Sequence, residues 1–241
     1  MKKILLGSVG FAVMLVAPAM AADMPVKALR GPPPPVLYNW TGCYVGVSGG
    51  WAGGDSTHIN RSAAGLDVPI TPEFDLRGGL IGGTLGCNWQ TSNWLFGIEG
   101  DASWTNKKGS VLDIAPFNTA FTSQTRENWI GTIRGRVGIT AGATNEWLFF
   151  ATGGLAVSDI EINVAGPPAF AGSESQTRWG WTAGGGIEWG FAPKWSAKVE
   201  GLFIDWQNKA YFTPPPAGLA NRTGGVEVRD WIARAGINFH F

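Results

Sequence analysis

Ten charged side chains stand at alternate positions within stretches of this 241-residue chain that otherwise have the pattern of extended strands. Alternate residues of a strand share one face, so these charges are expected to meet on the same side of a sheet. Burying an unpaired charge costs several kcal/mol, and the basic and acidic residues are equal in number, which favours a sealed, salt-bridged core. The alternative is an ion-selective constriction, although a selective pore usually carries an excess of one sign. The ten residues are Glu99, Asp101, Arg134, Arg136, Arg178, Glu188, Lys198, Glu200, Asp230 and Arg234.

Residues suited to catalysis or to metal binding are few. Covalent catalysis needs a base beside the nucleophile, and the two histidines, His58 and His240, are expected at opposite ends of the strands, His58 in a long loop. A serine can reach His240 geometrically, but no sequence motif supports such a pair. Two separated histidines and two cysteines provide no metal-binding set. We therefore expect no enzymatic activity, no metal and no cofactor.

Eight segments are long enough to cross a bilayer as strands, which takes about 9–11 residues each. The connections between them alternate between short turns and long loops, the long ones at 53–73, 106–123, 160–175 and 208–225. Such alternation is typical of bacterial outer-membrane barrels, whereas a β-sandwich has no reason to alternate in this way. The sequence thus predicts an all-β, up-and-down antiparallel transmembrane barrel of eight strands, with short periplasmic turns and long extracellular loops. The expected strands are 39–52, 74–90, 94–105, 124–140, 146–159, 176–190, 195–208 and 226–241.

The apolar and polar faces are clearest in four of these strands. In 124–140, Trp129 is assigned to the apolar face and Asn128 to the polar face. The strands 94–105, 176–190 and 195–208 alternate in the same way. The first, second and fifth strands are glycine-rich or apolar on both faces, so we assign no facing there.

The last sixteen residues alternate most regularly and end on a bare aromatic residue. A strand that closes a barrel in lipid can end in this way, because its apolar face meets acyl chains and its edge is paired. The alternating strand also resembles the signal that the barrel-assembly machinery reads. The residues of that expected signal are Ile237, Phe239 and Phe241.

The thirteen tryptophans favour a membrane barrel over a sandwich. Trp94 and Trp104 are ten residues apart, about 33 Å along a strand, which a tilt of about 40° reduces to roughly 25 Å of height. Indole rings prefer the two membrane–water interfaces, which lie about that far apart. The pairs Trp40–Trp51 and Trp195–Trp206 span odd intervals, so one member of each pair should face inward or follow a bulge. The residues expected in the two aromatic girdles are Trp40, Trp89, Trp94, Trp104, Trp129, Trp179, Trp189, Trp195 and Trp231.

The amino-terminal segment predicts secretion. Lys2 and Lys3 precede an apolar run and a small-x-small site, so residues 1–21 are expected to form a signal peptide. The apolar run is shorter than the roughly 20 residues of a spanning helix. Residues 22–38, with four consecutive prolines, are expected to form an extended periplasmic linker, and 39–241 the barrel. The chain without its signal peptide has 16 basic and 18 acidic residues, 16 − 18 = −2, which does not suggest nucleic-acid binding.

The two cysteines are expected near the short-turn rim on neighbouring strands. Cys43 lies early in the first strand and Cys87 near the end of the second. The oxidising periplasm allows a cross-strand disulfide, although the geometry of a disulfide is restrictive. The alternative, which we favour, is two free thiols that face the lipid.

The chain resembles the small eight-stranded outer-membrane proteins of alphaproteobacteria, the porin-like or outer-membrane immunogenic group. The resemblance spans the chain after the signal peptide and rests on WTGCYVG at 40–46, GG at 82–83 with NWQ at 88–90, WIGTIRGR at 129–136, TGGLA at 152–156 and the terminal Phe241. Cys43 and Cys87 depart from the family pattern, which is usually aromatic there. The resemblance implies the fold and an outer-membrane location in a Gram-negative bacterium, with both termini periplasmic, and it implies no single activity.

The expected role is therefore structural: an outer-membrane barrel that supports envelope integrity and presents interaction loops. The alternatives are a porin-like channel for small solutes and a loop-borne receptor or adhesin. The family suggests haem as one ligand of such loops. His58, which is expected in a long loop, is the histidine that could bind it. The expected partners are outer-membrane lipid, lipopolysaccharide, the barrel-assembly machinery and periplasmic chaperones, with no nucleic acid; the oligomeric state stays open.

Overall fold

The computed structural model describes residues 37–61, 67–115, 119–167, 170–207, 209–211 and 224–241. The expected signal peptide and most of the expected linker lie outside these residues. None of the described residues belongs to a helix long and apolar enough to cross a membrane.

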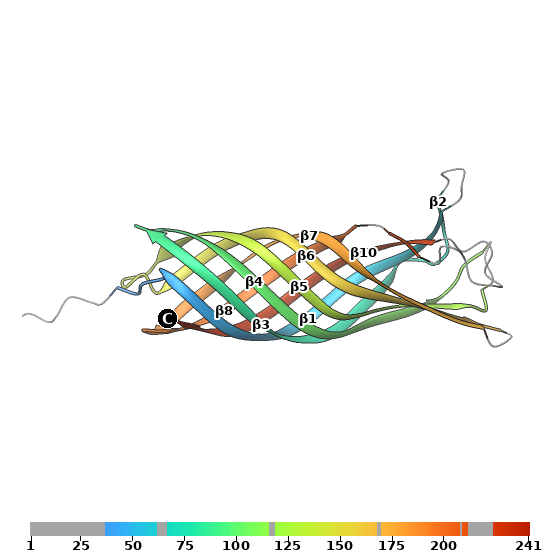
Figure 1. Cartoon of the computed structure of the whole chain (residues 1–241), viewed down its shortest axis with the longest axis horizontal. Helices are drawn as coiled ribbons and strands as arrows, with labels where there is room; N and C mark the ends of the chain where they lie inside the picture. Colours follow the sequence, from blue (N-terminus) through green and yellow to red (C-terminus); the bar gives the residue numbers. More distant parts are fainter. Residues whose placement is uncertain (1–36, 62–66, 116–118, 168–169, 208, 212–223) are drawn as a thin grey trace, which may run out of the picture. The chain divides into compact units, whose positions relative to one another are not determined.

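Eight long antiparallel strands form a closed ring (Figure 1). Each pairs with the next along the chain, and β1 also pairs with β10 from Tyr44–His240 to Asn60–Gly224, so the ring has no open edge. This closure confirms the predicted barrel and excludes two stacked open sheets. The long strands are β1 (Gly42–Arg61), β3 (Phe74–Thr91), β4 (Trp94–Leu112), β5 (Thr122–Ala141), β6 (Trp147–Gly166), β7 (Phe170–Ala192), β8 (Trp195–Trp206) and β10 (Gly224–His240). Two short strands, β2 (Asp67–Pro69) and β9 (Lys209–Tyr211), extend the sheet beside β1 and β10.

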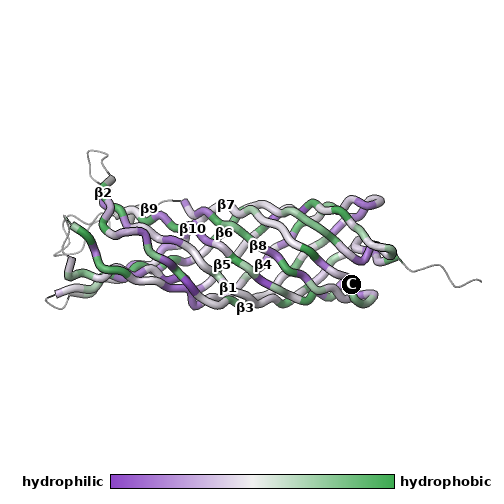
Figure 2. Tube along the Cα trace, turned by 180° about the vertical axis from the view of Figure 1, so that it is seen from behind, coloured by the Kyte–Doolittle hydropathy of each residue, from purple (hydrophilic) through white to green (hydrophobic). Residues whose placement is uncertain are grey.

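Hydrophobic and polar residues alternate along the strands (Figure 2). In β8, for example, every second side chain from Ser196 to Trp206 is buried in the lumen, and Trp195 and Val199 are exposed on the outer surface. The facing that the sequence left open is now clear. Tyr44 and Ser48 of β1 point inward, as do the alternate residues of β3 and β6.

Several strands are longer than predicted. The residues 160–175, expected as a loop, are largely the ends of β6 and β7, and β4 continues to Leu112. The 20 residues of β6 span about 66 Å, well beyond the membrane. The strand ends above the lipid face water on their outer side, so they lack the outward apolar residues by which a transmembrane strand is recognised. On the inner side of β6, Ile160, Ile162 and Val164 continue the alternation.

An irregularity in the pairing of β4 with β5 changes the facing of one predicted residue. The register of β4 with β5 shifts between Trp104 and Lys107, and the register of β5 with β6 shifts between Glu127 and Ile130. Asn128, expected to face inward, is therefore exposed beside Trp129. A bulge of this kind re-aims side chains without ending the strand.

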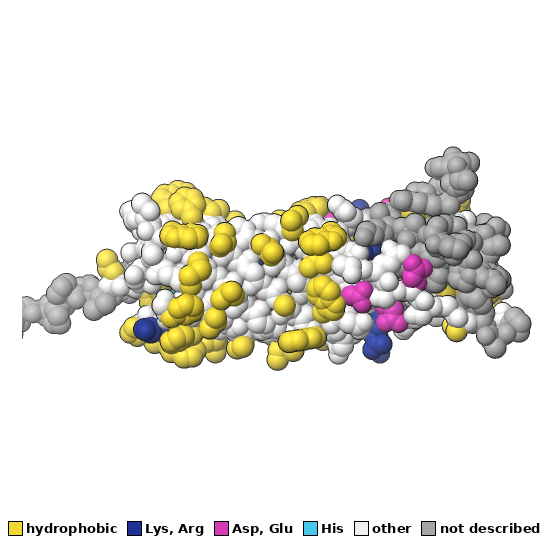
Figure 3. Space-filling model, viewed as in Figure 1, with side chains coloured by type: hydrophobic (Ala, Val, Ile, Leu, Met, Phe, Trp, Pro, Cys, Tyr) yellow, Lys and Arg dark blue, Asp and Glu magenta, His cyan; other side chains and the backbone are white. Residues whose placement is uncertain are grey.

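Large hydrophobic side chains gather in two bands around the visible outer surface, and acidic side chains gather beyond one of them (Figure 3). Eight of the nine indoles expected in the girdles are exposed: Trp89, Trp94, Trp104, Trp129, Trp179, Trp189, Trp195 and Trp231. The ninth assignment is wrong, because Trp40 is fully buried at the end of the lumen. Each odd-spaced pair has one inward member, with Trp40 at 0% and Trp51 at 58% exposure, and Trp206 at 2% and Trp195 at 44%.

Candidate functional site

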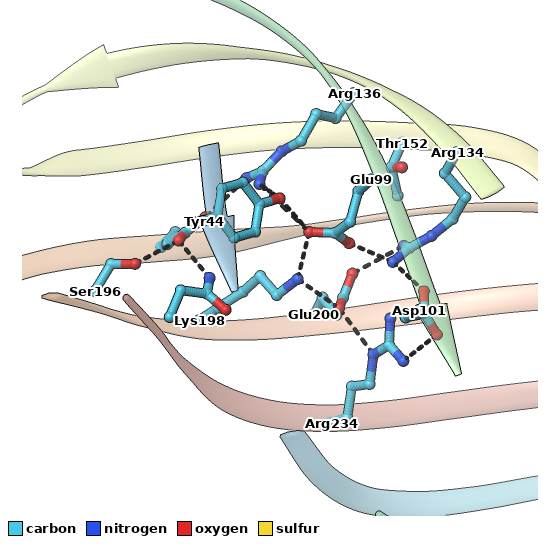
Figure 4. A network of polar contacts seen from close by, with 12 residues as sticks. Tyr44, Glu99, Asp101, Arg134, Arg136, Thr152, Ser196, Lys198, Glu200 and Arg234 are labelled. Atoms are coloured by element: carbon cyan, nitrogen blue, oxygen red, sulfur yellow. Dashed lines mark hydrogen bonds and ion pairs between the residues drawn. The ribbon is translucent and has the colours of Figure 1, made fainter. Parts of the chain in front are cut away.

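The lumen of the barrel contains a network of charged side chains that reaches from wall to wall (Figure 4). Its centre is Arg134 of β5, whose guanidinium lies 2.5 Å from Glu99, 2.9 Å from Asp101 and 2.9 Å from Glu200. The same guanidinium donates through Nε to Thr132 at 2.9 Å. All four ionic side chains are at most 2% exposed, so their charges are compensated by each other and not by water.

Lys198 and Arg234 complete this centre from the opposite wall. Lys198 Nζ lies 2.8 Å from Glu99 and 3.1 Å from Glu200. Arg234 contacts Asp101 at 2.7 Å and Glu200 at 2.8 Å. Since β4 and β8 lie on opposite sides of the eight-strand ring, the contact between Lys198 and Glu99 crosses the full width of the lumen. An eight-stranded barrel is just narrow enough for side chains to do this.

Tyr44 and Arg136 extend the network toward the short-turn end. The Tyr44 hydroxyl donates to Glu99 at 2.5 Å and accepts from Arg136 at 2.7 Å, and Arg136 also contacts Glu188 at 2.8 Å. Gly86 faces the Tyr44 ring, and a Cβ at that position would lie 2.5 Å from it. The tyrosine was not predicted as part of the site, because the first strand gave no clear facing.

Eight of the ten predicted charges belong to this one network, which we call the central network. Its four basic and four acidic residues carry a formal charge of 4 − 4 = 0. The contacts alternate in sign throughout, so no ring of a single sign lines the lumen among these residues. The members are Glu99, Asp101, Arg134, Arg136, Glu188, Lys198, Glu200 and Arg234.

The other two predicted charges lie nearer the long-loop end. Asp230 contacts Lys107 at 2.5 Å and accepts from Trp206 Nε1 at 2.5 Å, and Lys107 also forms an ion pair with Glu127. Arg178 is buried and donates to the Val226 carbonyl at 2.6 Å. Lys107 was not predicted because it falls beyond the expected end of its strand, 94–105. Glu127 was not predicted because it lies two residues before Trp129, on the face of 124–140 that was expected to be apolar, and the register shift turns it inward. The inward alternation that continues past the bulge is the signal that could have found them.

Apolar side chains fill the lumen around this second cluster. Leu76, Ile130, Leu202 and Ile232, each from a different strand, are among the most buried residues, and they pack with others into one hydrophobic core. The described lumen therefore changes along its length from a charged region near the short turns to an apolar one toward the long loops.

Aromatic side chains close the short-turn end. Trp40 packs 4.5 Å from Tyr38 and 5.8 Å from His240, measured between ring centroids, and its Nε1 donates to the Asn145 carbonyl at 2.8 Å. Burial, followed by the charge of Glu188, raises the pKa of Tyr38 to about 12. The expected linker therefore ends too late, since Tyr38 already packs against the barrel.

His240 lies beside a serine but not in a catalytic arrangement. Ser196 Oγ is 2.9 Å from His240 Nε2 and 2.6 Å from a carboxylate oxygen of Glu188, which is itself 3.8 Å from the same histidine nitrogen. In a catalytic triad the histidine stands between the nucleophile and the carboxylate. Here the serine donates to the carboxylate directly, and its side chain is fully buried.

His58 does not lie in a loop, contrary to prediction. It belongs to β1, is buried in the lumen, and contacts Thr125 Oγ1 through Nε2 at 2.9 Å and the ring of Phe74 at 5.6 Å. The longer first strand explains the difference. The haem-binding alternative thereby loses the loop histidine on which it depended.

Cys43 and Cys87 form a disulfide, so the expectation of free thiols is wrong. The two residues are direct partners in the register of β1 and β3, with their Cα atoms 3.9 Å apart. They are half-buried on the outer side of the wall. The antiparallel register thus places the two side chains on the same face at the same height.

The residues of the expected assembly signal lie at the outer surface of the closing strand. Ile237 and Phe241 are exposed, and Phe239 packs 5.0 Å from the Trp195 ring. The Phe241 amide donates to the Cys43 carbonyl at 3.0 Å, so the last residue is held by the first strand.

Comparisons with known proteins agree with this architecture. Residues 9–239 match the family described as outer membrane protein beta-barrel domain. The 31 kDa outer-membrane immunogenic protein of Brucella melitensis is 31% identical over 100% of both chains, and the 25 kDa outer-membrane immunogenic protein of Brucella canis is 29% identical over 93% of this chain and 92% of that protein. The outer membrane protein OprG of Pseudomonas aeruginosa has a similar fold, with a TM-score of 0.50 and 13% identity over 86% of this chain and 100% of that chain. The chain is thus a member of the outer-membrane β-barrel family and lies in the bacterial outer membrane.

Proposed function

We propose that this protein is a closed structural barrel that supports the integrity of the outer membrane. The central network is the observation that carries this proposal. Its side chains meet across the lumen, and its net charge is zero, whereas a selective pore usually presents one sign of charge to the solute. The apolar core toward the long loops and the aromatic residues at the short-turn end oppose ion passage at two further levels.

In the part of the chain that the structure describes, the serine–histidine contact is not a working nucleophile–base pair, which favours a structural role over an enzymatic one. Among the described residues, the serine–histidine contact is buried and has the wrong order of partners. The relatives are named outer-membrane immunogenic proteins, which is consistent with an exposed surface protein. Outer-membrane lipid and lipopolysaccharide are the proposed surroundings, and the barrel-assembly machinery and periplasmic chaperones the proposed partners during insertion.

Electrical recording tests the closed lumen. The purified, refolded chain without its signal peptide is expected to produce no stable current steps in planar bilayers and no faster uptake of small sugars by liposomes. Sustained, salt-dependent steps from a preparation shown to be folded would contradict the proposal and favour the channel alternative.

The supporting role needs a cellular measurement. A strain that lacks the protein is expected to become more sensitive to detergent and to large antibiotics, and the full chain should restore resistance. Unchanged sensitivity would contradict a role in envelope integrity while leaving the closed lumen unaffected.

A further inference from the structure

Three basic residues stand side by side on the outer surface of neighbouring strands. Arg77 of β3 is the register partner of Lys108 of β4, and Lys108 is the register partner of Arg126 of β5. All three side chains are exposed. We call Arg77, Lys108 and Arg126 the basic row.

The basic row lies just beyond one of the aromatic bands. Trp104 and Trp129 are register partners on β4 and β5, and the row follows them by three or four residues. At the usual rise this is about 10–13 Å along the strands, somewhat less in height because the strands are tilted. Indole rings mark the boundary of the hydrocarbon, so the row stands at the level of the lipid headgroups.

Placing like charges directly opposite each other destabilises a sheet, and the neighbouring carboxylates offset only part of this charge. Asp75 lies 2.6 Å from Arg77. Glu161 is the register partner of Arg126, but it accepts hydrogen bonds from Asn163 and Ser173. Neither Lys108 nor Arg126 forms an ion pair with any residue in the described part of the chain.

The contrast with the lumen is direct. The residues next to this like-charged pair, Lys107 and Glu127, are also register partners, and they form an ion pair inside the barrel. The same two strands therefore place opposite charges where water is excluded and like charges where the headgroups lie. An external anion would compensate for the second arrangement.

We infer that the basic row binds the phosphate groups of a glycolipid in the outer leaflet, namely the lipid A part of lipopolysaccharide. Guanidinium and ammonium groups form charge-assisted hydrogen bonds with phosphate. Directly beneath the two indoles, Ala102 of β4 is exposed, and its small size lets acyl chains approach the wall there, whereas its register partner Gly131 is covered by Trp129 and Val157. This inference depends on the outer-membrane location and not on the closed lumen.

Native mass spectrometry of the full chain without its signal peptide tests the site. The folded protein in detergent, with EDTA to remove divalent cations, is titrated with bisphosphorylated lipid A, with lipid A stripped of phosphate, and with inorganic phosphate as competitor. Lys108→Gln combined with Arg126→Gln is expected to weaken binding of the bisphosphorylated lipid roughly thirtyfold, because each basic residue near an anionic surface contributes about fivefold. The lipid without phosphate should bind wild type and variant equally weakly.

Arg229→Gln is the matched control. Arg229 is an exposed basic residue on β10, outside the basic row, 3.8 Å from Asp205. Its loss should leave binding within about twofold of wild type. The inference would be wrong if the double variant bound bisphosphorylated lipid A as well as wild type, if removal of phosphate had no effect, or if the control lost as much affinity. Displacement by millimolar inorganic phosphate would mean a site for free anions and would equally overturn a lipid site.

Discussion

Lys107 Nζ lies 2.5 Å from a carboxylate oxygen of Asp230, although β4 and β10 are not neighbours in the ring. The contact crosses the lumen within an apolar core, where an unpaired charge is costly. This ion pair connects two non-adjacent strands across the lumen, nearer the long-loop end than the central network. The fully buried Lys107 side chain is therefore expected to stabilise the barrel only while both of its carboxylate partners are present.

Lys107→Met should destabilise the barrel by about 3–5 kcal/mol, because it leaves Glu127 and Asp230 as uncompensated buried charges. Removing these charges as well, with Glu127→Gln and Asp230→Asn in the same chain, should restore much of the lost stability. Urea unfolding of the refolded protein in lipid vesicles, followed by tryptophan fluorescence, measures the difference.

The adjacent residue supplies a control with the same chemistry. Lys108→Met removes an exposed lysine one position along the same strand and should change the free energy of unfolding by no more than about 0.5 kcal/mol. Equal changes in the free energy of unfolding at the two positions would show that the buried ion pairs of Lys107 do not contribute specifically to stability.

The fold was predictable because alternation and loop length are local properties of the chain. Trp94 and Trp104 mark both ends of a transmembrane strand through their own spacing, and the strand that ends at Phe241 has a period of two. The odd interval between Trp40 and Trp51 also predicted that one of them faces inward or follows a bulge. Which one does so depends on the contacts of Trp40 with Asn145 and His240, residues about 100 and 200 positions away.

The sequence predicted the buried charges of the lumen only in the part of the barrel that lies within the membrane. Glu99 and Arg134 were found because each alternates with lipid-facing residues. Lys107 was missed because it lies beyond the expected end of its strand, and Glu127 was missed because the register shift reverses the facing that Trp129 predicts for it. Predicting the disulfide between Cys43 and Cys87 would have required the register of β1 with β3, which the composition of the chain does not provide.

Opening the lumen should require loss of the cross-lumen contact. Glu99→Ala combined with Lys198→Ala removes one charge of each sign and the 2.8 Å contact between opposite walls. Because the apolar core and the aromatic residues at the short-turn end are unchanged, the folded double variant is expected to show only small, brief current steps in planar bilayers, where wild type shows none. Ile98→Ala combined with Val199→Ala alters the adjacent lipid-facing positions and should stay silent. A folded but silent charge variant would place the barrier to ions elsewhere in the lumen.

The disulfide should be detectable in the secreted protein. Without reductant, the denatured chain is expected to take up no maleimide reagent, and after reduction it should take up two. Replacing both cysteines by serine should lower stability by up to about 4 kcal/mol in the chain-entropy treatment of a bond that joins residues 44 positions apart. Labelling of the unreduced chain at two positions would contradict the bond.

Deletion of Phe241 should reduce insertion into the outer membrane. The residue is exposed at the end of the closing strand, and its amide donates to Cys43 on the first strand, so its loss removes both an apolar contact and a closing hydrogen bond. The expected result is a smaller fraction of protein that shows the heat-modifiable mobility of a folded barrel in outer-membrane fractions. Phe191→Ala, at an exposed aromatic residue outside the closing strand, should insert normally. If both variants inserted equally well, the terminal aromatic residue would not be part of the assembly signal, and the closing strand would have to be recognised through Ile237 and Phe239 alone.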